Sequence, residues 1–520
     1  MDTILINGHV RTLTPVGRQH QALALLDGRI AALGSSRGIS ALATAKTRVL
    51  DLGGRTVLPG FIDSHMHAML TGLSLRSARL ETAVSVADVC HRLQAQADSA
   101  EEGQWVFGTL CLPISLAEGR FPTMQELDQV VPHNPALVIN ATFHSAACNS
   151  AAWKIIGPDL SAHGIEKDSS GRPTGSLLSD DTVFPAVRTA LGSLSDDDMQ
   201  AMYRAVGAHA ASRGITTLHC LDGQFVEADR DVDVLLRFGP ELPVHTVVMF
   251  QTTDVQKVVD MGLPRIGGCL TIDGAGFERT ALMYDPYPDD PTNCGDLYIP
   301  EEKVRSFVLE AHRAGLQIGM HALGDRAIDI LVGAYAEAMK DTPRDDCRHR
   351  VEHFCFPTPW AIEQAGELGL SLTMQPSFSW LWDQQPGSYY DALFGSERAI
   401  GSEPFGRLRD LGIMVGGGSD SPVTEVFPLL GVHSLVNNPR PERRVGVDYA
   451  LRMFTINNAW IAFEEQDKGT LEVGKLADLV VLDRDPYLEP ESIIDFNVDM
   501  TLKQGEITYD RDGLAARAGN

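Results

Sequence analysis

The chain has 520 residues, enough for two or three domains, and its 44% hydrophobic and 22% charged residues are ordinary for a globular protein. Its formal net charge of −26 argues against nucleic acid or an anionic membrane as a partner, because both require a basic face. No apolar run approaches the roughly 18 residues of a membrane span, and the N-terminal segment lacks a signal-peptide pattern. Eight cysteines without paired short spacing favour a reduced, cytoplasmic protein.

The two chain ends have the same character. Short strand-like runs with Asn-Gly and Asp-Gly turns occupy the first 57 residues. At the other end, a strand is predicted over Ala477–Asp483 and a hairpin over Met500–Tyr509. Neither end has enough apolar surface for a core of its own. We therefore expect residues 1–57 and 465–520 to form one small β-sandwich domain.

Between the ends, eight runs have the length and apolar content of buried strands. They are Val57–His67, Ile215–Asp222, Pro243–Phe250, Cys269–Gly274, Gln317–Ala322, Arg348–Cys355, Leu370–Pro376 and Ile413–Asp420. Helical patterns separate several of them, for example over Glu301–Ala314. Eight alternating β/α units predict an α/β fold of the (β/α)8 TIM-barrel type over residues 58–464.

The first two runs are separated by far more residues than one crossover helix needs. We therefore expect an insertion over residues 75–195, after barrel strand 1. It contains its own strand-like run, Ala136–Thr142, followed by His144. Because loops after barrel strands lie on the catalytic face, the insertion is predicted to form part of a lid or substrate pocket.

Metal-binding residue types recur at the ends of these strand-like runs. The donors are His65, His67, His321, His353 and Asp420. His65 and His67 are two residues apart, so on a strand they point the same way, as two imidazoles on one metal must. A lone strand-end histidine is more often a hydrogen-bonded residue than a ligand, but five donors at one barrel face predict a metal site that activates water.

Asp420 follows three glycines, which let the backbone pass close to a site. A carboxylate beside such a water can accept its proton and deliver it to a leaving amine. The competing interpretation is a turn cap, since Ser419–Pro422 is turn-like. Together with the histidines, the pattern predicts a metal-dependent hydrolase.

The chain resembles the amidohydrolase superfamily of metal-dependent hydrolases, in particular the YtcJ-like branch that includes N-substituted formamide deformylases. The motifs are Leu58–His67, His144–Ser150, Arg172–Gly175, Gly214–His219, His321–Arg326, His349–His353, Met374–Pro376, Gly418–Pro422 and Gly469–Leu479. The likeness covers nearly the whole chain. It implies hydrolysis of a carbon–nitrogen bond of a small amide-type molecule, with His65, His67, His321 and His353 as ligands and Asp420 as ligand and general acid/base.

One position departs from the pattern. Many relatives have a lysine on the fourth strand, four residues before the Asp-Gly pair; here Asp273-Gly274 places Cys269 there. Either the site holds one metal, or the Cys269 thiolate bridges two. Cys220 is a second thiolate candidate, and inert packing is the alternative for both. Zinc or another divalent metal suits a shell of nitrogen, sulfur and oxygen.

The resemblance also suggests residues that contact substrate. Residues of its motifs on the expected catalytic face are His144, Asn149, His219 and Gln375, each of which also has a structural hydrogen-bonding interpretation. Trp380 and Trp382 follow the seventh strand and could stack on an apolar acyl group or pack a lid.

Two other functions compete. A mononuclear deaminase would release ammonia, but it usually needs an acidic proton donor after strand five, and Ala322–Arg326 contains no glutamate. A scaffold that has lost its chemistry is disfavoured because all five donors are present. Relatives often form dimers, so a homodimer is compatible with the resemblance.

Overall fold

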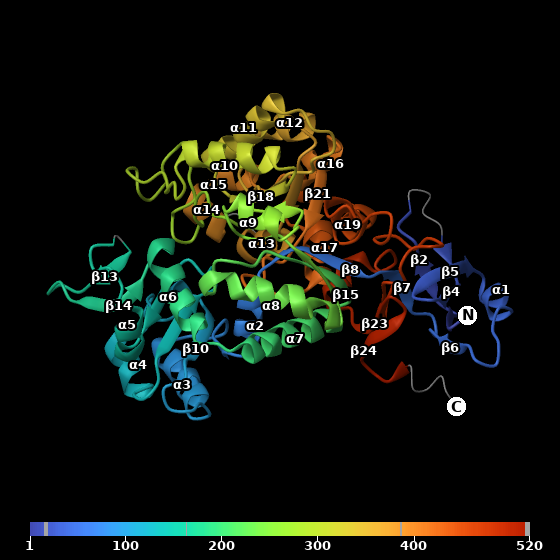
Figure 1. Cartoon of the computed structure of the whole chain (residues 1–520), viewed down its shortest axis with the longest axis horizontal. Helices are drawn as coiled ribbons and strands as arrows, with labels where there is room; N and C mark the ends of the chain where they lie inside the picture. The colour runs from blue at the N-terminus through green and yellow to red at the C-terminus, as the bar shows by residue number, and fades with distance from the viewer. Residues whose placement is uncertain (15–18, 163, 385–386, 515–520) are drawn as a thin grey trace.

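The computed structural model describes residues 1–14, 19–162, 164–384 and 387–514. Strands from both chain ends lie together at one end of the molecule, on the right of Figure 1. The order β5-β4-β1-β6 makes one sheet from β1 (Thr3–Ile6), β4 (Ala22–Leu26), β5 (Arg29–Gly34) and β6 (Arg48–Asp51), beside the short helix α1 (Ser36–Ser40). The order β24-β23-β22-β7-β2-β3 makes the other from β2 (His9–Arg11), β3 (Gln19–His20), β7 (Thr56–Pro59), β22 (Leu479–Leu482), β23 (Val498–Lys503) and β24 (Glu506–Asp510).

These two sheets share one apolar cluster. Leu5 and Leu25 of the first sheet pack in it with Val57, Leu479 and Leu502 of the second. The predicted C-terminal strand and hairpin are present as β22 and β23–β24, and β22 pairs antiparallel with β7. The two chain ends therefore depend on each other for a core, as their low apolar content predicted.

Within the described residues, the centre of the chain is built from eight mostly buried strands. They are β8 (Phe61–Met66), β15 (Ile215–Cys220), β16 (His245–Val248), β17 (Arg265–Ile266), β18 (Gln317–Ala322), β19 (Arg350–His353), β20 (Ser371–Met374) and β21 (Met414–Gly417). All pairings are parallel, in the orders β16-β15-β8 and β17-β18-β19-β20-β21. Single parallel bridges, Phe250 to Ile266 and Met66 to Ser421, connect the edges of the two sheets. Parallel strands buried on both faces are the core of an α/β fold.

Helices lie between and after these strands along the chain. They are α2 (Ala68–Leu75), α7 (Asp196–Ser212), α8 (Arg230–Phe238), α9 (Val255–Asp260), α10 (Glu301–Arg313), α11 (Asp325–Asp341), α12 (Pro359–Glu367), α13 (Pro376–Trp382), α14 (Tyr389–Phe394), α15 (Ser396–Gly401), α16 (Phe405–Asp410), α17 (Pro428–Asn437), α18 (Val447–Met453) and α19 (Ile456–Ile461). Helix α10 shows why such segments are helical. Val304, Phe307, Val308 and Ala311 recur on one face and are buried, while the first turn is acidic and the last basic.

Two predicted strands are corrected by the structure. The run Val57–His67 divides into β7, which belongs to a chain-end sheet, and β8. The predicted strand Cys269–Gly274 is wrong: the fourth strand is the two-residue β17, and Cys269 lies in the turn after it. The reason is Gly267-Gly268, whose φ values of 95° and 58° break the strand. A Cβ at Gly267 would lie 2.1 Å from the Gly319 carbonyl oxygen, so only glycine fits.

Residues 78–192, between α2 and α7, form a layer of their own, at the lower left of Figure 1. Its sheet has the order β13-β14-β12-β11-β10-β9, from β9 (Ala78–Arg79), β10 (Val106–Cys111), β11 (Ala136–Asn140), β12 (Ala146–Cys148), β13 (Ile165–Lys167) and β14 (Pro173–Leu177). Its helices are α3 (Val86–Ala97), α4 (Met124–Val130), α5 (Ser150–Ile156) and α6 (Asp180–Gly192). The strand predicted at Ala136–Thr142 is β11.

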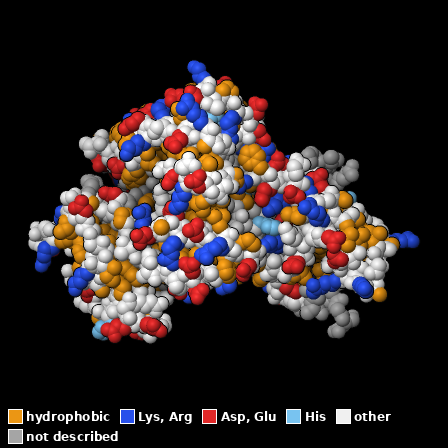
Figure 2. Space-filling view, viewed as in Figure 1, with side chains coloured by type: hydrophobic (Ala, Val, Ile, Leu, Met, Phe, Trp, Pro, Cys, Tyr) orange, Lys and Arg blue, Asp and Glu red, His pale blue; other side chains and the backbone are white. Residues whose placement is uncertain are grey.

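On the face drawn in Figure 2, basic side chains are interspersed with acidic ones rather than gathered into one patch. Among the described helices, none combines the length and the apolar content that crossing a membrane would require.

Candidate active site

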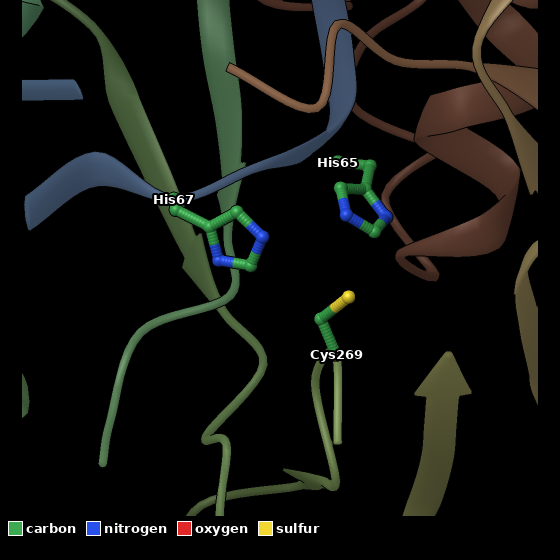
Figure 3. Close-up of side chains that lie close together, drawn as sticks. All are labelled: His65, His67 and Cys269. Atoms are coloured by element: carbon green, nitrogen blue, oxygen red, sulfur yellow. The ribbon is translucent and has the colours of Figure 1, made fainter. Parts of the chain in front are cut away.

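Six buried side chains converge where the parallel strands end. They are His65, His67, Cys269, His321, His353 and Asp420. Ligand atoms within 4.8 Å of one another form three overlapping groups: His65 with His67 and Cys269, Cys269 with His321 and His353, and His65 with His353 and Asp420. The first group is drawn in Figure 3, where both imidazoles and the thiol surround one space. The five donors predicted from the strand ends are therefore brought together, and Cys269 joins them.

Cys269 is the residue that the first two groups share. Its Sγ lies 3.6 Å from Nε2 of His353 and 3.8 Å from Nδ1 of His321. The turn after β17 places it across from His65 and His67 (Figure 3), so its sulfur faces two pairs of imidazoles.

Asp420 approaches the cluster from the end of β21. Its Oδ1 lies 3.2 Å from Nε2 of His65 and 3.4 Å from Nε2 of His67. Its backbone N–H donates to the His65 carbonyl at 2.8 Å, and its φ of 56° is left-handed. A non-glycine residue held in this region costs of order 1–3 kcal/mol, and such strain clusters at functional sites.

His65 of β8 and His67, which follows the strand, each have one ring nitrogen held by a hydrogen bond on the side away from the cluster. Nδ1 of His65 donates to Oε2 of Glu352 at 2.6 Å, and Nδ1 of His67 donates to the Leu221 carbonyl at 2.9 Å. Since the carbonyl can only accept, Nδ1 of His67 must carry the proton. In both rings Nε2 is left with its lone pair facing the cluster.

His321 and His353 follow the same rule. Nδ1 of His353 donates to Oε1 of Gln375 at 2.8 Å, which leaves Nε2 facing Cys269. Nε2 of His321 donates to the Gly274 carbonyl at 3.3 Å, which leaves Nδ1 facing Cys269. A metal-bound histidine usually donates its other nitrogen to such an acceptor.

The donor set fits a divalent metal. Nε2 of His65 is buried and, within the described part of the chain, has no hydrogen-bond partner although Asp420 is close. Burial lowers the pKa of His65, but the charges of Cys269 and Asp420 outweigh it and raise that pKa well above its ordinary value. Burial raises the pKa of the Cys269 thiol, yet His65 and the neighbouring imidazoles bring it well below its usual range. The same negative charges that raise the pKa of His65 would also attract a metal cation.

Two buried aspartates hold the cluster's backbone. Asp63 accepts from the N–H groups of His65 at 3.1 Å and Ser419 at 3.0 Å, which fixes β8 against the loop that carries Asp420. Burial raises the pKa of Asp63 to about 6. Asp273 accepts from Leu282, Leu323 and Gly324 N–H groups at 2.8–3.0 Å. Neither role was predicted from the sequence, where the available signal was the position of Asp63 beside the His-x-His motif and of Asp273 in the Asp-Gly pair.

Glu352 forms a fully buried ion pair with Arg350 at 2.7 Å. It also accepts from His65 and from the Thr373 hydroxyl. Glu352 therefore lies behind His65, outside the cluster of six side chains.

A cavity of about 90 Å³ opens onto the cluster. His67, Cys269, His321, His353 and Asp420 form its base. The insertion contributes to its wall through Thr142, Phe143, His144 and Phe184. Side chains from the segment between β8 and β15 thus reach the cavity.

The substrate candidates divide into two sets. His144 and Trp382 line the cavity, and the His144 ring lies 6.2 Å from that of His321. Asn149, His219, Gln375 and Trp380 are not among the described residues that line it. Gln375 acts instead on His353.

The other three have structural contacts. Asn149 caps α5 and bonds to the backbone of Ala136 and Asn134. His219 lies 3.4 Å from the Arg350 guanidinium, and burial lowers its pKa well below the ordinary value. The Trp380 ring packs edge-on against His433 at 4.7 Å. Cys220 belongs to none of the donor groups among the described residues, and burial raises its pKa well above the usual range.

Known proteins resemble this chain over nearly its whole length. The protein LONG AFTER FAR-RED 3 of Arabidopsis thaliana is 28% identical over 98% of this chain and 91% of its own. An N-substituted formamide deformylase of Arthrobacter pascens is 27% identical over 98% of this chain and 99% of its own. Among solved structures, an uncharacterised metal-dependent hydrolase from Pyrococcus furiosus is 25% identical, with a TM-score of 0.74 over 93% of this chain and 99% of that one.

The sequence profile described as Amidohydrolase family matches residues 48–509, which include every donor of the buried cluster. The likeness predicted from the motifs is confirmed: the chain belongs to the amidohydrolase family.

Proposed function

We propose that this chain is a metal-dependent amidohydrolase that cleaves a carbon–nitrogen bond of a small amide-type molecule. The observation that carries the proposal is the set of four histidines, each with one nitrogen fixed from behind and the other facing Cys269 or Asp420. In a structural histidine both ring nitrogens normally have a hydrogen-bond partner. Each of these four histidines leaves one ring nitrogen available to bind a shared metal.

For the architecture, we infer that the two central sheets close into one (β/α)8 barrel. The two single parallel bridges at their edges support closure, because they join the first strand to the last and the third to the fourth. Residues 1–57 and 465–520 are then a β-sandwich domain, 58–464 the barrel, and 75–195 its insertion. The shared core of the chain-end sheets supports this division.

The ligands in this proposal are His65, His67, His321, His353, Asp420 and Cys269. Their nitrogen, sulfur and oxygen donors suit zinc, with one or two ions per chain. When bound, the metal lowers the pKa of water and polarises a carbonyl oxygen. The position of Cys269 between two pairs of imidazoles supports a thiolate shared by two ions.

Asp420 is the proposed general acid/base. It lines the cavity, so its carboxylate reaches both the cluster and the space for a substrate. Burial raises its pKa, but His65 and His67 bring that pKa well below the usual range. The carboxylate therefore starts ionised, takes the proton of the attacking water and passes it to the departing nitrogen, which leaves as a neutral amine.

Of the candidate substrate-binding residues, we propose that His144 and Trp382 contact the substrate, because both line the cavity. Asn149 and His219 hold backbone and neighbours in place, and Gln375 orients His353.

The test is metal content, measured by plasma mass spectrometry on the purified wild type, Cys269→Ala and Cys220→Ala. We expect about two zinc equivalents in the wild type and in Cys220→Ala, which removes a buried thiol outside the cluster. We expect about one in Cys269→Ala. No metal in a folded wild type would refute the catalytic proposal.

Product analysis separates the competing functions. An amidohydrolase releases an amine, which an amine-reactive fluorophore detects, whereas a deaminase releases ammonia, which a coupled dehydrogenase assay detects. No glutamate lies among the described residues of the cavity wall, which favours the amide reaction. Ammonia release with one metal per chain would establish the deaminase instead. Bound metal with no hydrolysis of any amide would point to the scaffold.

A further inference from the structure

One glutamate outside the insertion reaches across to it. Glu278 lies in the segment after β17, and its Oε1 accepts from Nδ2 of Asn140 at 2.9 Å and from Oγ1 of Thr142 at 2.6 Å. The Ser145 hydroxyl donates to the same oxygen at 3.5 Å. These donors lie at the end of β11 and in the turn between β11 and β12. Polar side chains of the insertion thus converge on one carboxylate oxygen that belongs to the central part of the chain.

The turn that Glu278 contacts forms part of the cavity wall. Residues 142–144 line the cavity, and the His144 ring lies 6.2 Å from that of His321 in the metal-ligand cluster. The backbone hydrogen bonds of this turn stay within the insertion, for example from the Ala141 N–H to the Cys111 carbonyl at 2.9 Å. The side-chain bonds to Glu278 therefore join the turn to the strands that carry the cluster.

The segment that carries Glu278 is closed on itself and contacts a residue of the cluster. The Gly274 N–H donates to the Thr280 carbonyl at 3.1 Å, and the Thr280 N–H donates to the Ala275 carbonyl at 3.1 Å. The Gly274 carbonyl accepts from Nε2 of His321 at 3.3 Å. Glu278 therefore lies on a closed loop whose base holds one histidine of the cluster.

Removing this carboxylate would leave the turn without its acceptor. Asn140 is 7% exposed and Thr142 is 6% exposed, so water does not readily replace Glu278 as their partner. Hydrogen bonds to an ionised acceptor are also stronger than those between neutral groups. The expected response is local, because the bonds join one turn to one loop: the turn separates from the loop, and His144 moves away from His321.

We propose that Glu278 is a positioning residue, which holds the turn between β11 and β12 over the metal-ligand cluster and so places His144 beside His321. The inference adds a residue to the proposed amidohydrolase site, and it rests on that proposed function only for the zinc in the cluster.

Deuterium exchange tests the attachment itself. In Glu278→Ala the backbone amides of residues 141–148 should exchange at least about ten-fold faster than in the wild type, while those of β19 stay protected. The matched control is Glu166→Ala, because Glu166 accepts from the Thr174 hydroxyl at 2.6 Å within the insertion. It should leave exchange in residues 141–148 unchanged. Unchanged exchange there in Glu278→Ala, or equally faster exchange across the whole chain, would overturn the proposal.

Zinc transfer measures whether the turn covers the cluster. The zinc-loaded protein is mixed with excess 4-(2-pyridylazo)resorcinol, a chelator whose absorbance reports the zinc that it removes. Transfer should be at least about ten-fold faster in Glu278→Ala, because the displaced turn exposes the cluster, and near wild type in Glu166→Ala. Glu278→Gln keeps an oxygen acceptor for the same donors, so both of its rates should lie closer to wild type than to Glu278→Ala. Wild-type transfer in Glu278→Ala would overturn the positioning role.

The two measurements separate this proposal from the proposed function. A folded wild type without zinc would refute the metal-dependent hydrolase, and the exchange experiment, which needs no metal, would still decide the role of Glu278. If Glu278→Ala does not fold, Thr142→Val makes the same test from the insertion, because a methyl group of similar size replaces the hydroxyl that donates at 2.6 Å. Unchanged exchange in residues 141–148 of Thr142→Val would then overturn the proposal.

Discussion

Nδ1 of His65 lies 2.6 Å from Oε2 of Glu352, and both side chains are completely buried. The two residues are 287 positions apart in the chain. Glu352 also pairs with Arg350 and accepts from Thr373, so its carboxylate joins β8 to β19 and β20. A carboxylate behind a metal-bound histidine fixes the ring and raises its basicity.

Glu352→Gln is therefore expected to weaken metal binding by about 10–100-fold. Competition with a chromophoric chelator measures this affinity. The variant also leaves Arg350 buried without a carboxylate, which we expect to lower the free energy of unfolding by about 3–5 kcal/mol.

The control is Glu337→Gln, which removes a 65% exposed carboxylate that pairs with Arg305 on the surface. Such pairs contribute little, so both metal affinity and stability should stay near wild type. Unchanged metal affinity in folded Glu352→Gln would show that His65 keeps its orientation without this carboxylate.

A second prediction concerns Gly418. A Cβ there would lie 2.7 Å from Cβ of His65 and 2.8 Å from its backbone nitrogen. Gly418→Ala must therefore push β8 and the Asp420 loop apart, at a cost of about 1–3 kcal/mol. Denaturant unfolding measures the stability, and mass spectrometry should show fewer than wild-type zinc equivalents.

Gly401→Ala provides the comparison. Gly401 ends α15, and a Cβ there meets no described heavy atom within 4 Å. This variant should change stability by less than about 1 kcal/mol and keep full metal content. Full metal content in Gly418→Ala would mean that the close packing of the two segments is not needed for the cluster.

The histidine and aspartate donors could be predicted from sequence because each follows an apolar strand run. Parallel strands bring their carboxyl ends to one edge, so strand-end donors meet without knowledge of the tertiary contacts. Cys269 was harder. The resemblance placed Cys269 on a predicted fourth strand. In the structure that strand ends at Gly267-Gly268, and the turn that follows carries the thiol into the cluster.

The partners behind the ligands could not be predicted. Whether Glu352 reaches His65, or Gln375 reaches His353, depends on side-chain direction between neighbouring strands, which one sequence does not give. The same holds for Asn149 and Trp380: their motifs are local, but whether they face the cavity depends on the register of the insertion sheet and of α13.

A third prediction concerns pH and Asp231. This carboxyl is fully buried, and burial together with the nearby charge of Asp222 raises its pKa to about 7. An unfolded aspartate titrates near 3.9. The folded state therefore binds the proton more tightly, so this contribution to stability is complete below about pH 4 and is lost as pH rises toward 7.

Asp231→Asn removes this titration. Between pH 5 and 7 the wild type should lose up to about 1.4 kcal/mol per pH unit from this group, and the variant should lose correspondingly less. Urea unfolding at pH 5, 6, 7 and 8 measures the difference. Asp233→Asn, on the same helix α8, is the control and should follow the wild-type pH dependence. Parallel curves for wild type and Asp231→Asn would contradict the prediction.

The last prediction concerns the segment that supplies Trp382 to the cavity. Asp383 ends α13 with no exposed surface, and its carboxylate lies 2.6 Å from Nη2 of Arg440 and 2.7 Å from Nη1 of Arg443. Both arginines follow α17, so this network ties the end of α13 to the segment after α17. Asp383→Asn leaves two poorly solvated guanidinium groups, and we expect it to lower the free energy of unfolding by about 3–5 kcal/mol.

The distinguishing consequence is local. Because the network holds the end of α13, the α13 backbone amides should exchange with deuterium faster in Asp383→Asn, while those of β8 should stay protected. Asp410→Asn, whose 68% exposed carboxylate pairs with Arg409, should change stability by no more than about 1 kcal/mol and leave exchange in α13 unchanged. Uniformly faster exchange across the chain would show that Asp383 stabilises the whole domain rather than the cavity wall.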